Sequence, residues 1–168
     1  MAKSVRRRRR SGDNVLDPRK SIVFLDANSL DDCHYCDIKC VEKICHLNNN
    51  LDDYGVIFQL PNLVRQEIDH VNTPEYVKRR ACDFIYTTMT PLNPDESILS
   101  ANLRSHFKGN GVGDRHTADS NHIFEALKYG AGYFITEDAR IKKKSNALDI
   151  RVLSRHEFIV VLDKFEIL

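Results

Sequence analysis

The chain lacks long apolar segments, an even set of cysteines and an apolar stretch behind its basic N-terminus. No apolar run approaches the ~18 residues of a membrane-spanning helix, so we expect no membrane association. Five cysteines are an odd number, which argues against a disulfide framework and fits a reducing compartment. A secretory signal would need an apolar segment after the basic residues. We therefore expect a cytoplasmic protein, and its 168 residues suffice for one domain with its own core.

The net charge of +1 hides an uneven distribution of charge along the chain. Residues 1–20 carry eight basic and two acidic side chains, a net of +6, which leaves −5 for residues 21–168. Five of the basic residues are consecutive: Arg6, Arg7, Arg8, Arg9 and Arg10. Because this segment has no apolar face to bury, we predict that residues 1–20 are a disordered arm. Its arginines would bind nucleic-acid phosphates, and the alternatives are a solubilising tail or a segment that binds an antitoxin or the ribosome.

Strand-like and helix-like segments alternate over residues 21–168, which we predict to be one domain. SIVFLD, YGVIFQLP, GYFIT and ALDIRVLS have the apolar character of buried strands. Helices are expected at about Leu30 to Leu47, around Glu67, over TPEYVKRRACDFIYTTM, from Thr117 to Tyr129 and over RHEFIVVLDKFEI, whereas residues 91–116 are expected to be irregular. The alternation predicts an α/β fold, a three-layer α/β/α sandwich with a mainly parallel central sheet.

Four acidic residues lie either just after a strand-like segment or within a helix-like one. Asp26 ends SIVFLD, Glu67 lies in LVRQEID, Asp119 begins a helix and Asp138 follows YFIT. A parallel sheet would gather them at its carboxyl edge, where the active sites of such sheets lie. Clustered carboxylates repel one another unless cations neutralise them, and their oxygens are the ligands that Mg²⁺ or Mn²⁺ prefers. We therefore predict that these four acids bind one or two such ions and are catalytic.

Several polar neighbours accompany the acids. Asn28 cannot carry a negative charge, so we expect it to orient a water or Asp26 itself. The Thr136 hydroxyl would hold a water or a carboxylate, since it lies on the same side of its strand as the fourth acid. For His122, one helical turn beyond the third acid, we favour a structural role at the boundary of helix and sheet. Glu137 is expected to be solvated.

These segments resemble the PIN-domain nucleases. Asp26-Ala27-Asn28 after a buried strand is similar to the D-x-N that opens such domains, and IFQLPNLVRQEID is similar to their strand, proline and glutamate-bearing helix. The segment from Asp119 through YGAGYFITED is similar to their third acid, helix, Gly-Ala turn, strand and final T-x-D. The resemblance covers residues 21 to about 155 and fills all four acidic positions.

The resemblance implies a PIN-like, Mg²⁺- or Mn²⁺-dependent endoribonuclease that hydrolyses RNA to 5′-phosphate and 3′-hydroxyl ends. The small size is similar to that of the toxin in toxin-antitoxin pairs, whose partners would be RNA and a protein antitoxin or inhibitor; a homodimer is also compatible. The basic arm departs from compact toxins, so an RNA-processing nuclease is an alternative. A non-catalytic PIN-like module that binds RNA or protein is another, although four repelling carboxylates argue against it. A phosphatase with an aspartyl nucleophile would need a second Asp where Asn28 stands.

The segment DDCHYCDIKCVEKICH raises the question of a zinc site, because it holds four cysteines and two histidines. Cys33, Cys36, Cys40 and Ile44 recur at helical spacing on one face, and free cysteine behaves as a small buried hydrophobe. Zinc sites usually place a turn between their ligand pairs, and this segment has none. We therefore predict a core-facing helix here.

Overall fold

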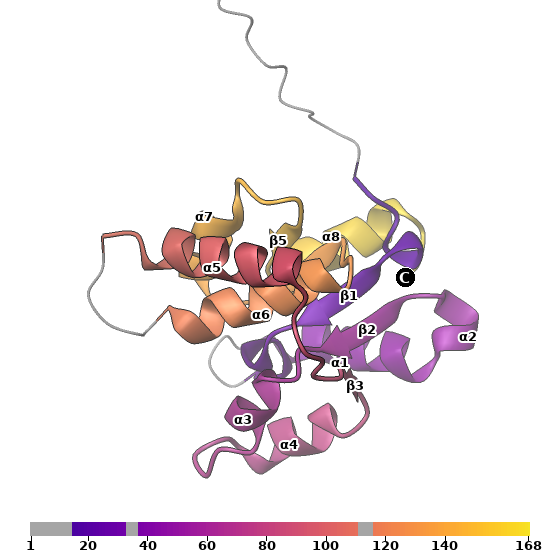
Figure 1. Cartoon of the computed structure of the whole chain (residues 1–168). Coiled ribbons are helices and arrows are strands. Elements are labelled where there is room, and N and C mark those ends of the chain that lie inside the picture. The colour runs from indigo at the N-terminus through magenta and orange to yellow at the C-terminus, as the bar shows by residue number, and fades with distance from the viewer. Residues whose placement is uncertain (1–14, 33–36, 111–115) are drawn as a thin grey trace, which may run out of the picture.

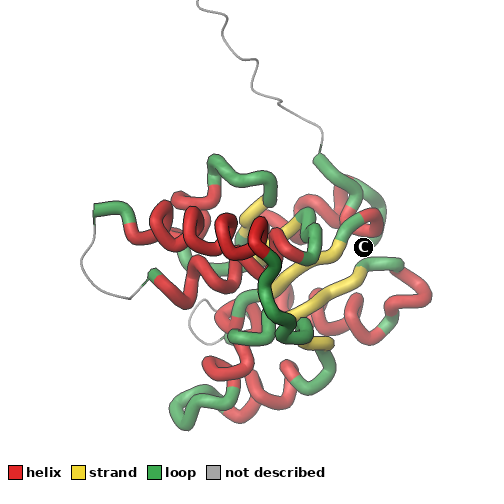
Figure 2. Tube along the Cα trace, in the orientation of Figure 1, coloured by secondary structure: helices red, strands yellow, loops and turns green. Residues whose placement is uncertain are grey.

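The computed structural model describes residues 15–32, 37–110 and 116–168, and in this part of the chain a five-stranded sheet lies among eight α-helices (Figures 1 and 2). The strands are β1 (Ile22–Leu25), β2 (Ile57–Leu60), β3 (Ile85–Tyr86), β4 (Tyr133–Ile135) and β5 (Arg151–Leu153). The helices are α1 (Ile38–Asn49), α2 (Leu51–Tyr54), α3 (Val64–Ile68), α4 (Glu75–Ala81), α5 (Pro94–Lys108), α6 (Thr117–Lys128), α7 (Ala139–Ser145) and α8 (Arg155–Lys164), with the 3-10 helices η1 (Pro18–Lys20) and η2 (Ala27–Leu30). The predicted phosphate-binding arginines at 6–10 lie outside the described residues.

The sheet has the strand order β3-β2-β1-β4-β5, and each of these neighbouring pairs is parallel. β1 is the central strand, with Phe24 in register with Gln59 of β2 and with Phe134 of β4. All five carboxyl ends therefore point to the same edge. The prediction of a three-layer α/β/α sandwich with a mainly parallel sheet is confirmed.

Alternate side chains of the central strands enter two separate cores. Val23 and Leu25 of β1 pack in a core with α1, α3, α4 and α8, whereas Phe24 between them packs with α5, α6 and α7. β4 divides in the same way, because Phe134 joins the second core and its neighbours join the first. Figure 1 shows these helix layers on either side of the sheet. Burial on both faces explains why the strand sequences are almost continuously apolar.

The packed part of the chain begins before Ser21, where the sequence analysis placed its start. Pro18 is buried in η1, and the Asp17 side chain accepts a hydrogen bond from the Arg19 amide at the start of that turn. The Tyr133 hydroxyl donates a hydrogen bond to the Leu16 carbonyl, which attaches this segment to β4. Residues 15–20, assigned above to the arm, therefore belong to the fold.

Two segments differ from the sequence prediction. The helix expected over TPEYVKRRACDFIYTTM ends at Ala81, and Ile85 and Tyr86 instead pair with β2 as the edge strand β3. Residues 91–116, expected to be irregular, contain the 15-residue helix α5. Its start is fixed by a capping box in which the Asn93 side chain accepts from the Glu96 amide and the Glu96 carboxylate accepts from the Asn93 amide.

The cysteine-rich segment is only partly described. The helix expected from about Leu30 begins at Ile38, after η2 and residues 33–36, which lie outside the described residues together with Cys33 and Cys36. Cys40 and Ile44 are both buried in α1, as the core-facing helix requires. No helix in the described ranges is long and apolar enough to cross a membrane.

Candidate metal centre

Asp26 is the most restrained of the candidate acids. It directly follows β1 at the carboxyl edge, is 4% exposed, and its amide donates to the Ile135 carbonyl of β4 at 2.9 Å. Its Oδ1 accepts from the Ala27 amide at 2.9 Å. Its Oδ2 accepts from the Thr136 hydroxyl at 2.7 Å and from the Asn28 side-chain amide at 3.0 Å. These donors hold the carboxylate in one orientation at the sheet edge.

Asn28 and Thr136 connect this carboxylate to the end of β4. Oδ1 of Asn28 accepts from the Glu137 amide at 3.0 Å, and Oγ1 of Thr136 accepts from the Asp138 amide at 3.1 Å. Thr136 is fully buried, and its amide donates to the Leu153 carbonyl of β5. Both polar residues therefore act on the position of Asp26, and through it they join the ends of β1 and β4.

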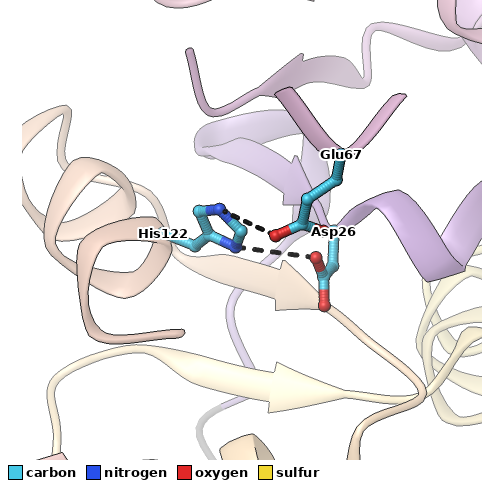
Figure 3. A group of neighbouring side chains, drawn as sticks. All are labelled: Asp26, Glu67 and His122. Atoms are coloured by element: carbon cyan, nitrogen blue, oxygen red, sulfur yellow. Dashed lines mark ion pairs between the residues drawn. The ribbon is translucent and has the colours of Figure 1, made fainter. Parts of the chain in front are cut away.

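Glu67 and His122 complete a compact group with Asp26 (Figure 3). His122, on α6, is 2% exposed, and its ring faces both carboxylates. Its Nδ1 lies 3.7 Å from Asp26 Oδ1, and its Nε2 lies 3.5 Å from Glu67 Oε1. One donor atom from each of the three residues falls within 4.8 Å of the other two. We expected His122 to have a structural role at the boundary of helix and sheet. The structure adds that its ring nitrogens contact two of the candidate acids.

The donor set fits a divalent cation. Two carboxylates supply hard oxygen ligands, and one imidazole supplies a nitrogen that Mn²⁺ accepts more readily than Mg²⁺ does. Glu67 has a side chain that is 44% exposed, so one ligand can adjust while Asp26 stays fixed. A bound ion would also relieve the repulsion between the carboxylates. These three side chains could hold the Mg²⁺ or Mn²⁺ expected from the sequence.

Asp119 and Asp138 lie at the same edge but outside this three-donor group. Asp119 is in the first turn of α6, with an oxygen 4.0 Å from Nδ1 of His116. Asp138 caps α7, where its carboxylate accepts from the Arg140 amide at 2.8 Å and pairs with the Arg140 guanidinium at 2.6 Å. That pairing lowers the pKa of Asp138. Asp138, the fourth predicted metal ligand, is therefore already paired with a cation, the Arg140 guanidinium.

The acids nevertheless interact electrostatically across the edge. Burial raises the pKa of Glu67, and the charges of Asp26 and Asp119 raise it further, while His122 opposes them. Burial also raises the pKa of Asp119, followed by the charges of Asp138 and Asp26. The charges of Asp26, Asp119 and Asp138 therefore act on the neighbouring carboxyl groups of Glu67 and Asp119. The sheet has brought together residues that are far apart in sequence.

A buried glutamate that the sequence analysis did not select holds two of these elements together. Glu125 of α6 is 8% exposed, and its carboxylate accepts from the Thr87 hydroxyl at 2.6 Å and from the amides of Asn62 and Leu63 at 3.0 and 3.4 Å. The two amides precede α3, the helix that carries Glu67. Glu125 therefore joins α6 to α3. Its position one turn after His122 was the available signal.

A buried arginine supports the opposite side of the edge. Arg155 begins α8 and is fully buried, and its Nη1 donates to the Asp31 carbonyl at 2.7 Å, after η2. Its amide donates to the Glu137 carboxylate at 2.8 Å, and its Nε lies 3.3 Å from the same oxygen. Glu137, expected to be solvated, instead has a side chain only 14% exposed and pairs with the buried Arg155, because its amide is held by Asn28 Oδ1 next to the start of α8. The contacts tie α8 to the turn that carries Asp26.

Comparison with known protein families and with curated proteins finds no match for the chain. The PIN-like assignment therefore remains a prediction from the motifs. The structure adds an α/β/α fold and, at the expected edge, a cluster of side chains that could hold a metal ion.

Proposed function

We propose that this chain is a metal-dependent endoribonuclease. The observation that carries the proposal is the convergence of Asp26, Glu67 and His122, whose donor atoms lie within 4.8 Å of one another at the carboxyl edge of a parallel sheet. In open α/β sheets, ligands bind at this edge. They bind between two neighbouring strands whose following connections run to opposite faces of the sheet. Here β1 leads to α1 in one core, and β4 leads to α7 in the other.

The chemistry proposed for the edge is hydrolysis of a phosphodiester bond. Asp26, Glu67 and His122 would hold a divalent cation, which would activate a water for attack and stabilise charge on the phosphate oxygens. Asp26 contributes a rigid ligand, because three donors hold it. Glu67 contributes a half-exposed ligand that faces the substrate side. Asp119, with its raised pKa, can accept a proton or a hydrogen bond at the same edge.

RNA is the proposed substrate on the strength of the motif resemblance, with 5′-phosphate and 3′-hydroxyl products. The described part of the chain adds the metal-ligand geometry, which suits phosphodiester hydrolysis in general. The basic residues at 6–10 would supply the phosphate affinity that an acidic domain lacks.

A cleavage assay on single-stranded RNA tests the proposal. The full chain is incubated with Mn²⁺, with Mg²⁺ and with EDTA, and both product ends are mapped. We expect cleavage only with a cation, and 5′-phosphate ends. Glu67→Gln should reduce the rate at least about tenfold, because it removes a charged ligand. Glu42→Gln, at an exposed position of α1, is the matched control and should cut at the wild-type rate. Cleavage that persists in EDTA would reject the proposal.

A further inference from the structure

Three hollows lie next to one another around the candidate metal centre. The first has a volume of about 440 Å³, lies beside η2 and α4, and is lined by Asn28 and Glu67. The second, of about 370 Å³, lies between α3 and α6 and is lined by Glu67 and His122. The third, of about 210 Å³, shares Leu63 and Asn121 with the second. Glu67 lines the first two hollows, and Leu63 and Asn121 line the second and the third, so the three hollows are neighbours around the candidate metal ligands.

The third hollow has apolar walls and an apolar mouth. Leu63 and Phe124 form part of the wall, and Met89 and Leu92 come from the segment between β3 and α5. Met89 is 69% exposed and Leu92 is 43% exposed, so large apolar side chains face solvent beside the hollow. Exposed apolar side chains beside a concave site indicate a ligand with an apolar surface.

The polar groups of the third hollow restrict what that ligand can be. Asn121 lies where the third hollow meets the second, and its amide offers both a donor and an acceptor. Glu125 also lines the third hollow, with its carboxylate already accepting from Thr87, Asn62 and Leu63. Lys128 also lines this hollow, and its ammonium is paired with the Glu96 carboxylate at 3.5 Å. The hollow therefore has one anionic and one cationic side chain, both already engaged, so its charges do not favour a phosphate or an acidic peptide. A flat group with apolar faces and a polar edge fits both sets of contacts.

We propose that the third hollow is a nucleobase pocket. It accepts one base of the RNA strand whose phosphodiester lies at the metal centre, so the inference rests on the proposed ribonuclease function and specifies how its substrate is held. Single-stranded RNA is read in this way in general, with splayed bases placed against apolar or aromatic side chains and hydrogen bonded at their edges. The base stacks against the apolar wall, and Asn121 meets its edge.

Short RNAs that lack a single base test the pocket without depending on cleavage. Oligonucleotides of roughly six nucleotides, within the site sizes of single-strand binding grooves, carry one abasic nucleotide at each position in turn. Their binding to the full chain in EDTA is measured by fluorescence anisotropy. We expect one abasic position to weaken binding about tenfold, because a stacked base contributes roughly 1–3 kcal/mol. The other positions should change affinity much less.

A double variant, Met89→Ala with Leu92→Ala, removes the exposed apolar mouth. It should bind the intact RNA about tenfold more weakly than wild type and lose the dependence on the abasic position. Ile38→Ala with Val160→Ala is the matched control, since both residues are exposed apolar side chains on α1 and α8, in the other helix layer. This control should behave as wild type. Circular dichroism verifies that both variants are folded, which their exposed positions favour.

The outcomes separate the pocket from the nuclease. Wild-type protein that shows no base-sensitive position, or a double variant that keeps the wild-type sensitivity, overturns the pocket even if the RNA is cut. A base-sensitive position in a protein that cuts no RNA with Mn²⁺ or Mg²⁺ supports the pocket and rejects the nuclease.

Discussion

The three candidate ligand residues differ in how firmly the fold holds them. Asp26 receives hydrogen bonds from its own turn and from Thr136, whereas Glu67 extends from a short helix with 44% of its side chain exposed. His122 is buried, and its ring faces both carboxylates. A fixed carboxylate, an adjustable one and a buried imidazole suit an ion that must be held while a substrate approaches it. The nitrogen ligand is the feature that affects the choice of metal.

We predict that His122→Gln weakens Mn²⁺ binding more than Mg²⁺ binding. The variant keeps a polar side chain but removes the imidazole nitrogen, which Mn²⁺ accepts more readily than Mg²⁺ does. The expected loss for Mn²⁺ is about tenfold or more, the range found when residues around metal sites are changed. Isothermal calorimetry with each ion measures it, with His156→Gln on the exposed side of α8 as the control. An unchanged ratio of the two affinities would exclude His122 as a ligand.

The raised pKa values of Glu67 and Asp119 predict a pH dependence of stability. A carboxyl group whose pKa is higher in the folded state binds its proton more tightly when folded. Its contribution to stability is therefore present at low pH and is lost as the pH rises from the ordinary carboxyl range through the raised pKa. We expect the free energy of unfolding of the metal-free chain to fall over this interval, and Glu67→Gln to reduce the fall.

Urea denaturation at a series of pH values in EDTA measures this difference between wild type and Glu67→Gln. Added Mn²⁺ should restore stability at the upper end of the interval, because the ion binds the deprotonated carboxylates. Stability curves that run parallel for the two proteins would show that Glu67 does not experience the repulsion described here.

At the scale of elements, the site depends on contacts between short helices. α3 has only five residues and carries Glu67, so its position comes from its neighbours rather than from its own length. Glu125 of α6 binds the two amides before α3 and also the Thr87 hydroxyl after β3. This buried carboxylate therefore holds α3, α6 and the end of the edge strand β3 together. Any change in this contact should reach the metal centre.

Glu125→Gln should both destabilise the fold and weaken the metal site. It replaces a charged acceptor by a neutral amide, and leaving buried donors poorly satisfied costs about 1–3 kcal/mol. Metal affinity should fall as well, because α3 then loses its fixed position relative to His122. Thermal unfolding and Mn²⁺ calorimetry measure the two effects, with Glu42→Gln as the control. Lower stability with unchanged Mn²⁺ affinity would mean that α3 is held by other contacts.

Some of these elements could be predicted from the sequence, and others could not. β1 and β4 are almost unbroken apolar runs followed by an acid, so both the strands and the edge were evident. β3 is two residues long and takes its conformation from pairing with β2, which no local pattern shows. α5 has a weak apolar face, although Asn93 and Glu96 offered a capping signal. The contacts of His122 and Arg155 depend on how the helices pack, which no local sequence pattern shows, whereas Glu125 had a signal in its position one turn after His122.

At the scale of the whole molecule, charge is divided between the domain and its N-terminal segment. Residues 21–168 carry a net charge of −5, and they include the acidic edge where RNA is proposed to bind. The consecutive arginines at 6–10 precede the packed part of the chain, which begins by Leu16 and Pro18. An acidic domain needs a basic neighbour to attract a polyanion. Because the packed part begins at about residue 15, the residues before it can be removed without loss of the fold.

Deleting residues 1–14 should weaken RNA binding and flatten its dependence on salt, with the fold retained because residues 15–20 remain. Each arginine that neutralises a phosphate of a single strand adds about 0.7 to the slope of log affinity against log salt, so five can add up to about 3.5. Replacing only residues 6–10 by serine is the length-matched control and should give most of the same change. Equal slopes for full-length and shortened protein would assign the arginines another partner.

The central claim is that Asp26 is a metal ligand for RNA cleavage, and single-turnover cleavage by Asp26→Asn with Mn²⁺ tests it most directly. Asparagine keeps the shape and one acceptor for Thr136 and Asn28, but it loses the acceptor for the Ala27 amide and removes a charge that raises the pKa of Glu67. We predict a variant that remains folded and cuts at least about 100-fold more slowly, while Asp163→Asn on α8 cuts normally. Undiminished cleavage by folded Asp26→Asn would contradict the account.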